Sequence, residues 1–277
     1  MNLMNDGMKS IKLIALLTVL IASAYMPSAH AQILSRGNLF GPGAPPPMVG
    51  IEIGLGQHTQ QGTLACDCGS QFTSGTGTGI MGNLIFELPL DYDWALGIKA
   101  GVDFKNFSTT TLVNDIVVVE PANSPPPDTV TMSVERTGKI KATYLSFTPY
   151  LQYQFFRMGP FVQAGVNIGI LASNSLAQDR QLLQTSVTLK NGKIVNNLTF
   201  TNGTLSESIQ NGPQTSVNTL RLGLLLSAGY NIALSEKSVF SPLLTYDFPL
   251  TATGNTALSN WKIGSLYASA ILKFRLD

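Results

Sequence analysis

The sequence predicts an all-β fold: an eight-stranded antiparallel up-and-down transmembrane β-barrel with long extracellular loops. Apolar and polar side chains alternate over stretches of about ten residues, the length of a tilted strand that crosses a bilayer. Only 12% of the residues are charged, and glycine is frequent, with 26 residues. Because successive side chains of a strand point to opposite faces, each stretch has one apolar and one polar face. After Ala31 no apolar run reaches the roughly 18 residues that a membrane helix needs.

The first 31 residues predict a secretory signal peptide. Lys9 and Lys12 supply the positive beginning, Leu13 to Ala24 the apolar core, and Ala29-His30-Ala31 the small-residue cleavage site. We therefore expect an exported protein whose mature chain begins at Gln32.

The mature chain is electrically balanced. Removing Lys9, Lys12 and Asp6 with the signal peptide leaves 15 basic and 15 acidic residues. A chain without a basic excess offers no electrostatic footprint for nucleic acid, so we expect no nucleic-acid partner. Residues 32–47 contain the run GPGAPPP and predict a flexible leader, and residues 48–277 predict the barrel.

The clearest hairpin lies between Lys139 and Leu171. Its first strand places Leu145 and Phe147 on an apolar face, opposite Tyr144 and its polar neighbours. A tight link at 156–160 follows, and alternation then resumes. We interpret the apolar face as facing lipid and the polar face as lining the barrel.

Six more stretches alternate in the same way, and they begin and end near residues 48–58, 79–90, 95–104, 217–232, 239–249 and 262–276. The links between the eight stretches are alternately long and short. Short periplasmic turns and longer extracellular loops are typical of bacterial outer-membrane barrels.

Two long connections contain further β-rich runs. Thr109–Glu120 and Thr129–Arg136 flank a proline-rich tip, and we interpret them as strands that continue past the membrane as a two-stranded blade. In the second connection, Ser186–Leu189 and Ile194–Phe200 flank Lys190-Asn191-Gly192-Lys193. Asn-Gly between two β runs predicts a type I′ hairpin.

Prolines and aromatic residues add two local expectations. Pro149 and Pro242 lack an N–H for the ladder, so we expect a bulge or a local widening at each. Aromatic belts mark both interfaces of membrane barrels. We assign to the short-turn end Tyr92, Trp94, Phe155, Phe156, Phe161 and Phe240, and to the long-loop end Phe107, Trp261 and Tyr267.

By this pattern the chain, over about Met48–Leu276, resembles the eight-stranded outer-membrane barrels of the OmpA transmembrane-domain and OmpX type, and more loosely the generic outer-membrane β-barrel domains. Such barrels often end on an aromatic residue that the insertion machinery reads, whereas here Phe274 precedes Asp277 by three residues. The resemblance implies adhesion or surface binding through a protruding blade.

The charged residues on the polar faces decide which way the barrel faces. With the apolar faces inward, as in a soluble lipocalin-type barrel, they would decorate the surface; with the apolar faces toward lipid, they fill a narrow lumen and must pair. We favour the membrane barrel, with ten strands or another fold as further alternatives.

We predict contacts of Glu87 with Lys99, and of Lys273 and Arg275 with Glu52. We assign no partner to Arg221, and the predicted network comprises Glu52, Glu87, Lys99, Asp103, Arg221, Asp247, Lys273 and Arg275.

Little in the sequence points to catalysis or to a cofactor. His58, the single histidine of the mature chain, is expected at the rim of the first strand, and no triad signature accompanies it. Cys66 and Cys68 lie in the first outer loop, where a local disulfide or a redox-sensitive pair is favoured over zinc, which wants four ligands. We therefore predict no catalytic residues, no cofactor and no metal.

These observations favour a non-enzymatic protein of the bacterial outer membrane that binds a surface ligand or supports the envelope through its protruding hairpins. A small pore is the first alternative, and a lipid-modifying enzyme that relies on His58 is the second. The expected partners are outer-membrane lipid, the insertion machinery during assembly, and an extracellular protein or surface ligand.

Overall fold

The computed structural model describes residues 46–65, 71–119, 128–156, 158–188, 192, 194–196, 198–200, 203–214, 217–256 and 259–276. The regular elements of these residues are all β-strands. In the described part of the chain, no helix is long and apolar enough to cross a membrane. The predicted signal peptide, nearly all of the predicted leader and both cysteines, Cys66 and Cys68, lie outside the described residues.

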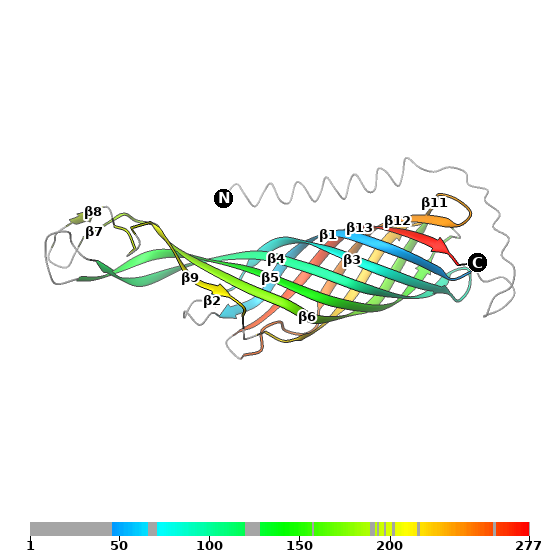
Figure 1. The fold of residues 1–277 in the computed structure, drawn as a ribbon, viewed down its shortest axis with the longest axis horizontal. Helices are drawn as coiled ribbons and strands as arrows, with labels where there is room; N and C mark the ends of the chain where they lie inside the picture. Colours follow the sequence, from blue (N-terminus) through cyan, green and yellow to red (C-terminus); the bar gives the residue numbers. More distant parts are fainter. Residues whose placement is uncertain are drawn as a thin grey trace.

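Eight long strands form a closed antiparallel ring (Figure 1). Each strand pairs with the next one along the chain, β6 pairs with β10, and β13 pairs with β1 to close the ring. The predicted all-β barrel with eight strands is therefore confirmed. The ring consists of β1 (Met48–Ala65), β3 (Gly75–Pro89), β4 (Trp94–Val119), β5 (Asp128–Gln154), β6 (Pro160–Leu182), β10 (Leu220–Tyr230), β12 (Ser238–Pro249) and β13 (Asn260–Arg275).

Five short strands extend or accompany the ring. They are β2 (Gln71–Phe72) on β1, β9 (Ser206–Gly212) on β6, β11 (Ile232–Ala233) on β12, and the separate pair β7 (Ser186–Thr188) and β8 (Ile194–Asn196). The β7–β8 pair is the hairpin predicted around Asn-Gly. Gly192 lies in its turn with a φ of 78°, which is a backbone conformation that glycine adopts without a steric cost.

Alternation along β1 shows how the wall is oriented. Ile53 and Leu55 expose 62% and 60% of their surface, whereas Glu52 and His58, on the other face, expose 1% and 0%. The apolar side chains therefore point outward and the polar ones point into the lumen, as in a barrel that lies in lipid.

Two strands extend far beyond the length that a bilayer needs. From Trp94–Tyr153 to Val119–Asp128, β4 and β5 pair in one unbroken register, which confirms the predicted blade. The far half of β6 pairs with β5, and β9 pairs with β6, so the blade has four strands rather than two. We call this part the outer sheet, and it comprises residues 110–119, 128–137, 176–182 and 206–212 (Figure 1).

The predicted bulges at the two prolines are not where the register changes. Pro149 and Pro242 each coincide with a short gap in one ladder, and the register is the same on both sides of each gap. The register of β5 with β6 shifts instead between Thr143 and Tyr144, where Ala172 has no partner on β5.

Aromatic residues form a belt at the short-turn end only in part. Tyr153 contacts both Trp94 and Phe155 there, with ring centroids 4.9 and 5.2 Å apart. The predicted belt at the other end is wrong, because its members face inward with the polar residues of their strands. The buried aromatic residues of the barrel include Phe107, Trp261 and Tyr267 from that predicted belt, and Phe161 from the belt predicted at the short-turn end.

Replacing Ile53 by Arg tests the outward face. We expect the free energy of unfolding in lipid vesicles to fall by about 2–4 kcal/mol, because a guanidinium would lie in hydrocarbon. Thr59→Arg is the matched control, since Thr59 is exposed on the same face of the same strand near its polar end. Equal losses for the two variants, measured by urea titration, would contradict a lipid-facing wall.

Candidate functional site: a buried charge network in the lumen

Eight charged side chains meet inside the barrel, and each exposes 5% of its surface or less. An isolated charge costs several kcal/mol to bury, so burial on this scale requires pairing. The network is balanced, with the four acids Glu52, Glu87, Asp103 and Asp247 and the four bases Lys99, Lys105, Arg221 and Lys273.

At the short-turn end, Glu87 of β3 pairs with Lys273 of β13, with 3.3 Å between Oε1 and Nζ. Tyr150 donates a hydrogen bond of 3.0 Å from its hydroxyl to Oε2 of Glu87. The Lys273 ammonium also lies 5.6 Å from the centroid of the Phe161 ring. Around this pair packs an apolar cluster of Ile85, Tyr150, Phe161, Leu243 and Ile271.

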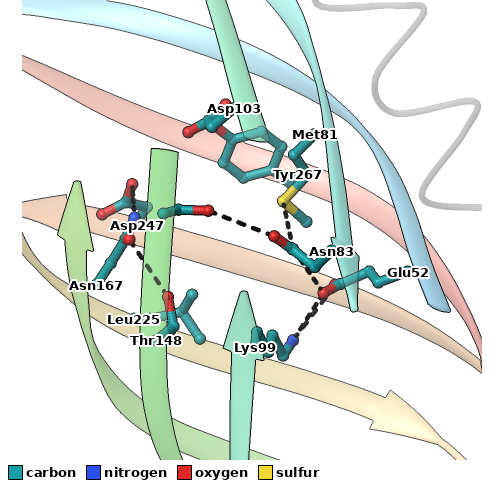
Figure 2. A pocket seen from close by; sticks show the side chains of 11 residues that line it. Glu52, Met81, Asn83, Lys99, Asp103, Thr148, Asn167, Leu225, Asp247 and Tyr267 are labelled. Carbon is teal, nitrogen blue, oxygen red and sulfur yellow. Dashed lines mark hydrogen bonds and ion pairs between the residues drawn. The ribbon is translucent and has the colours of Figure 1, made fainter. Parts of the chain in front are cut away.

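In the middle of the lumen, side chains of three strands donate to the carboxylate of Glu52. Figure 2 shows two of them, Lys99 and Asn83. The Lys99 ammonium lies 3.1 Å from Oε2, the Asn83 amide donates to Oε2 at 3.0 Å, and the Ser269 hydroxyl donates to Oε1 at 2.9 Å. Both oxygens are thus satisfied, as a buried carboxylate requires.

The sequence predicted the wrong partners for these two pairs. It joined Glu87 to Lys99 and Lys273 to Glu52, whereas the structure joins Glu52 to Lys99 and Glu87 to Lys273. In the ladder Lys99 lies opposite Ile85, and its long side chain reaches past β3 to β1. Arg275 is half-buried at the end of β13, opposite Met48 and four residues along β1 from Glu52.

Toward the long-loop end, Lys105 is the centre of the network. Its ammonium lies 2.7 Å from Asp103 and 3.7 Å from Asp247, and it donates to the Tyr267 hydroxyl at 2.6 Å and to the Ser265 hydroxyl at 2.8 Å. Tyr267 in turn donates to Asp103 at 2.7 Å. One cation therefore links β4, β12 and β13.

Lys105 was missed because the third strand was predicted to end at Phe104. Lys99, Asp103 and Lys105 are separated by even numbers of residues, so all three lie on one face of β4. Extending the alternation by one step would have found it.

Arg221, for which the sequence suggested no partner, binds Asp247. Its Nη1 lies 2.8 Å from Oδ2 of Asp247, and its Nη2 donates to the Ile263 carbonyl at 2.8 Å. Asn167 donates to the same Oδ2 at 3.0 Å. The guanidinium thereby ties β10 to β12 and β13.

His58 is not at the rim. Because β1 continues to Ala65, His58 is fully buried, its Nδ1 lies 2.9 Å from the Ser265 hydroxyl, and its ring meets Tyr267 edge-on at 5.7 Å. A Ser–His contact is one element of a nucleophilic site. Here both residues are enclosed, so the contact can hold β1 against β13.

A small cavity of the described residues lies beside the network. This cavity, lined by Glu52, Lys99, Asp247 and Tyr267, among others, offers about 20 Å³ to the centre of a water molecule (Figure 2). That is room for about one water. Among the described residues no group of three His, Cys, Asp or Glu side chains is placed to hold a metal ion.

Beyond the charges, an apolar cluster fills the long-loop end of the lumen. Phe107 and Trp261 stack there with ring centroids 5.3 Å apart. The cluster comprises Leu64, Phe72, Phe107, Ile140, Leu176, Val217, Trp261 and Ile263, which are buried side chains of strands and loops at that end. The two apolar clusters thus lie toward opposite ends of the lumen, and the one at the short-turn end packs around the Glu87–Lys273 pair.

Comparison with known proteins is consistent with this architecture. Residues 49–254 match the sequence model of the family described as "Outer membrane protein beta-barrel domain". No curated protein matches the sequence significantly.

One similar solved structure is that of Ail, the attachment invasion locus protein of Yersinia pestis, in complex with the heparin analogue sucrose octasulfate. Ail is 14% identical to this chain, 83% of this chain and 99% of that chain are covered, and the TM-score is 0.29. OprG from Pseudomonas aeruginosa is 10% identical, with 84% and 98% covered and a TM-score of 0.33. The outer membrane protease OmpT from Escherichia coli is 9% identical, with 83% and 97% covered and a TM-score of 0.33. Similarity at this level carries no argument about activity.

Removing one partner of the central pair tests the network. Lys99→Met leaves the Glu52 carboxylate buried without its cation, and we expect the free energy of unfolding to fall by about 3–5 kcal/mol. Adding Glu52→Gln should recover most of this loss, because no uncompensated charge then remains. Adding Glu87→Gln instead should not, since it leaves Lys273 unpaired. Urea titrations that show recovery with Glu87→Gln and none with Glu52→Gln would contradict the observed pairing.

Proposed function

Since the chain belongs to the outer membrane β-barrel domain family, we propose that this outer-membrane protein is a closed, non-enzymatic barrel that presents a β-sheet outside the membrane to bind a partner. The observation that carries the proposal is the outer sheet, in which the barrel wall continues as strands beyond the span that lipid requires. The charge network and the two apolar clusters inside the lumen support the closed barrel.

The lengths of the strands support a sheet that projects from the membrane. At about 3.3 Å per residue, a strand of 26 residues such as β4 is roughly 85 Å long. A tilted strand needs only about ten residues to cross an apolar band about 25 Å tall. More than half of β4 therefore lies outside the lipid.

The outer sheet has packing and ion pairs of its own. Asp115 of β4 binds Arg136 of β5 at 2.5 Å and lies 3.7 Å from Arg180 of β6, which also binds Glu207 of β9 at 2.5 Å. These contacts connect all four strands. On one face lies an apolar cluster of Met132, Val134, Leu182, Leu198 and Phe200. A segment that merely covered the barrel mouth would not need this independent core.

The outer sheet also has an open edge. Beyond Thr109, where β3 stops pairing, β4 pairs only with β5 among the described strands. The edge carries β-branched and apolar residues, and Leu112 exposes 66% of its side chain. Unpaired N–H and C=O groups along such an edge form a template for an added strand. We infer that the partner is an extended peptide segment that pairs with β4.

A pore is the less supported alternative. The cavity beside the charge network has room for about one water, and apolar clusters lie toward both ends of the lumen. Enzymatic activity is also less supported, because His58 and Ser265, which contact each other, expose only 0% and 1% of their surface.

Planar-bilayer recordings test the closed lumen. We expect the inserted protein to give no steady single-channel steps, since ions would have to pass two apolar clusters. Heat-modifiable gel mobility of the protein reconstituted in the vesicles that are fused to the bilayer verifies that the barrel is folded in lipid. Reproducible conductance steps of one size would contradict the proposal.

Two proline variants test the edge. Successive residues of a strand direct their N–H groups to opposite sides. The two variants are Leu112→Pro and Val113→Pro. One of them removes an N–H that faces β5, and the other removes an N–H that faces the open edge. The probe is a random-peptide display library, selected on the folded protein in detergent. We expect selected peptides to bind the variant that lacks the edge-facing N–H about tenfold more weakly than they bind the unchanged protein, which corresponds to roughly 1.4 kcal/mol.

The control replaces residues 112–135 by Asn-Gly, which joins the paired residues Thr111 and Arg136. Selected peptides that bind this shortened protein as well as the full one, or that bind both proline variants equally well, would contradict edge pairing.

A further inference from the structure

A hollow lies on the outside of the barrel wall, where β3, β4, β5 and β6 run side by side. It offers about 530 Å³ to the centre of a water molecule and lies outside the lumen network. Its lining consists of outward side chains and one neighbouring asparagine: Ile80, Phe104, Asn106, Lys141, Thr143, Ser173, Asn174 and Ser175.

The hollow coincides with the boundary between the apolar and polar parts of the outer face. On β4, the outward series changes from Phe104, which is 48% exposed, to Asn106. On β5 it changes from Leu145, 52% exposed, to Thr143, and on β6 from Ile170, 55% exposed, to polar residues. The floor of the hollow is therefore continuous with the lipid-facing surface.

The register shift in the wall explains why the surface is hollowed at this place. Thr143 pairs with Ser173 and Tyr144 with Leu171, so Ala172 is an extra residue in β6. Ala172 and Ser173 are both exposed although they are consecutive, as expected at a bulge. A bulge bends its strand and increases the local twist, and here it lies where β6 leaves β10 to join the outer sheet.

The polar lining combines one cation with neutral hydrogen-bonding groups. Within the described part of the chain, no carboxylate lies within ion-pairing distance of the Lys141 ammonium, whereas Lys139, two residues earlier in the chain, pairs with Asp179 at 3.6 Å. Thr143, Ser173, Ser175 and Asn106, which carry hydroxyl and amide groups, line the hollow together with Lys141.

We propose that this hollow binds the phosphorylated sugar headgroup of a glycolipid in the outer leaflet. A lysine ammonium suits a phosphate group, and hydroxyl and amide groups suit sugar hydroxyls. The exposed Ile80 and Phe104 extend under the first acyl carbons. Because the floor is part of the lipid-facing wall, a membrane lipid reaches the hollow by lateral diffusion. The lipid would brace the wall at the point where the outer sheet begins.

Native mass spectrometry of the folded protein in a neutral detergent tests the proposal, with bisphosphorylated lipid A as the probe. We expect Lys141→Gln to weaken lipid A binding about tenfold, because the charge-assisted contact is lost. Thr143→Val, which removes a hydroxyl and keeps the shape, should weaken binding less. The matched control is Lys262→Gln on β13, four strands away around the ring, where the lysine also faces outward and donates to the Leu250 carbonyl at 3.2 Å.

Each remaining outcome overturns the proposal. Unchanged binding by both Lys141→Gln and Thr143→Val shows that the hollow is not the site. An equal loss with Lys262→Gln shows general attraction between cations and anionic lipid. Equal binding of dephosphorylated lipid A refutes the phosphate contact, and equal binding of phosphatidylglycerol refutes the sugar contacts. Heat-modifiable gel mobility identifies the folded fraction of each variant, and the Thr143→Val arm decides the matter if Lys141→Gln does not fold.

Discussion

The backbone of a strand in hydrocarbon has no water to bond with, so every N–H and C=O there must find a partner in another strand. The ring meets this requirement because β6 pairs with β10 across the long connection between them, and β13 pairs with β1 to close the ring. Closure at eight strands also sets the width of the lumen, which side chains must fill. The inward charges are therefore forced to pair, and the structure balances four acids against four bases.

The ion pairs connect strands that are not hydrogen-bonded neighbours in the ring. Glu52 of β1 reaches Lys99 of β4 past β3, and Glu87 of β3 reaches Lys273 past β1. Breaking one pair would leave a buried charge, so these contacts penalise a shift of any strand along its neighbour. A lumen that is filled in this way holds the wall rigid. We place the binding functions accordingly on the outside, at the open edge of the outer sheet and at the hollow beside Lys141.

Alternation in the sequence predicted the faces of the strands, because a period of two directly assigns Ile53 outward and Glu52 inward. It could not predict the ion-pair partners, since pairing across a lumen depends on the stagger of strands that are distant in the sequence. It also ended strands too early. Thr59, Gln60 and Gln61 look like a loop, yet β1 continues through them, which moved His58 from the rim into the lumen. The same error hid Lys105, and the bulge at Ala172 has no sequence signature comparable to proline.

In this structure one continuous wall passes from lipid into water. A scan of single spin labels at outward positions of β4, from Leu96 through Phe104 to Leu112, measures this most directly through collisions with oxygen, which dissolves in lipid, and with a water-soluble nickel chelate. We predict high oxygen and low chelate accessibility from Leu96 to Phe104, and the reverse from Asn106 to Leu112. High oxygen accessibility that persists to Leu112, or chelate accessibility along the whole strand, would contradict the account.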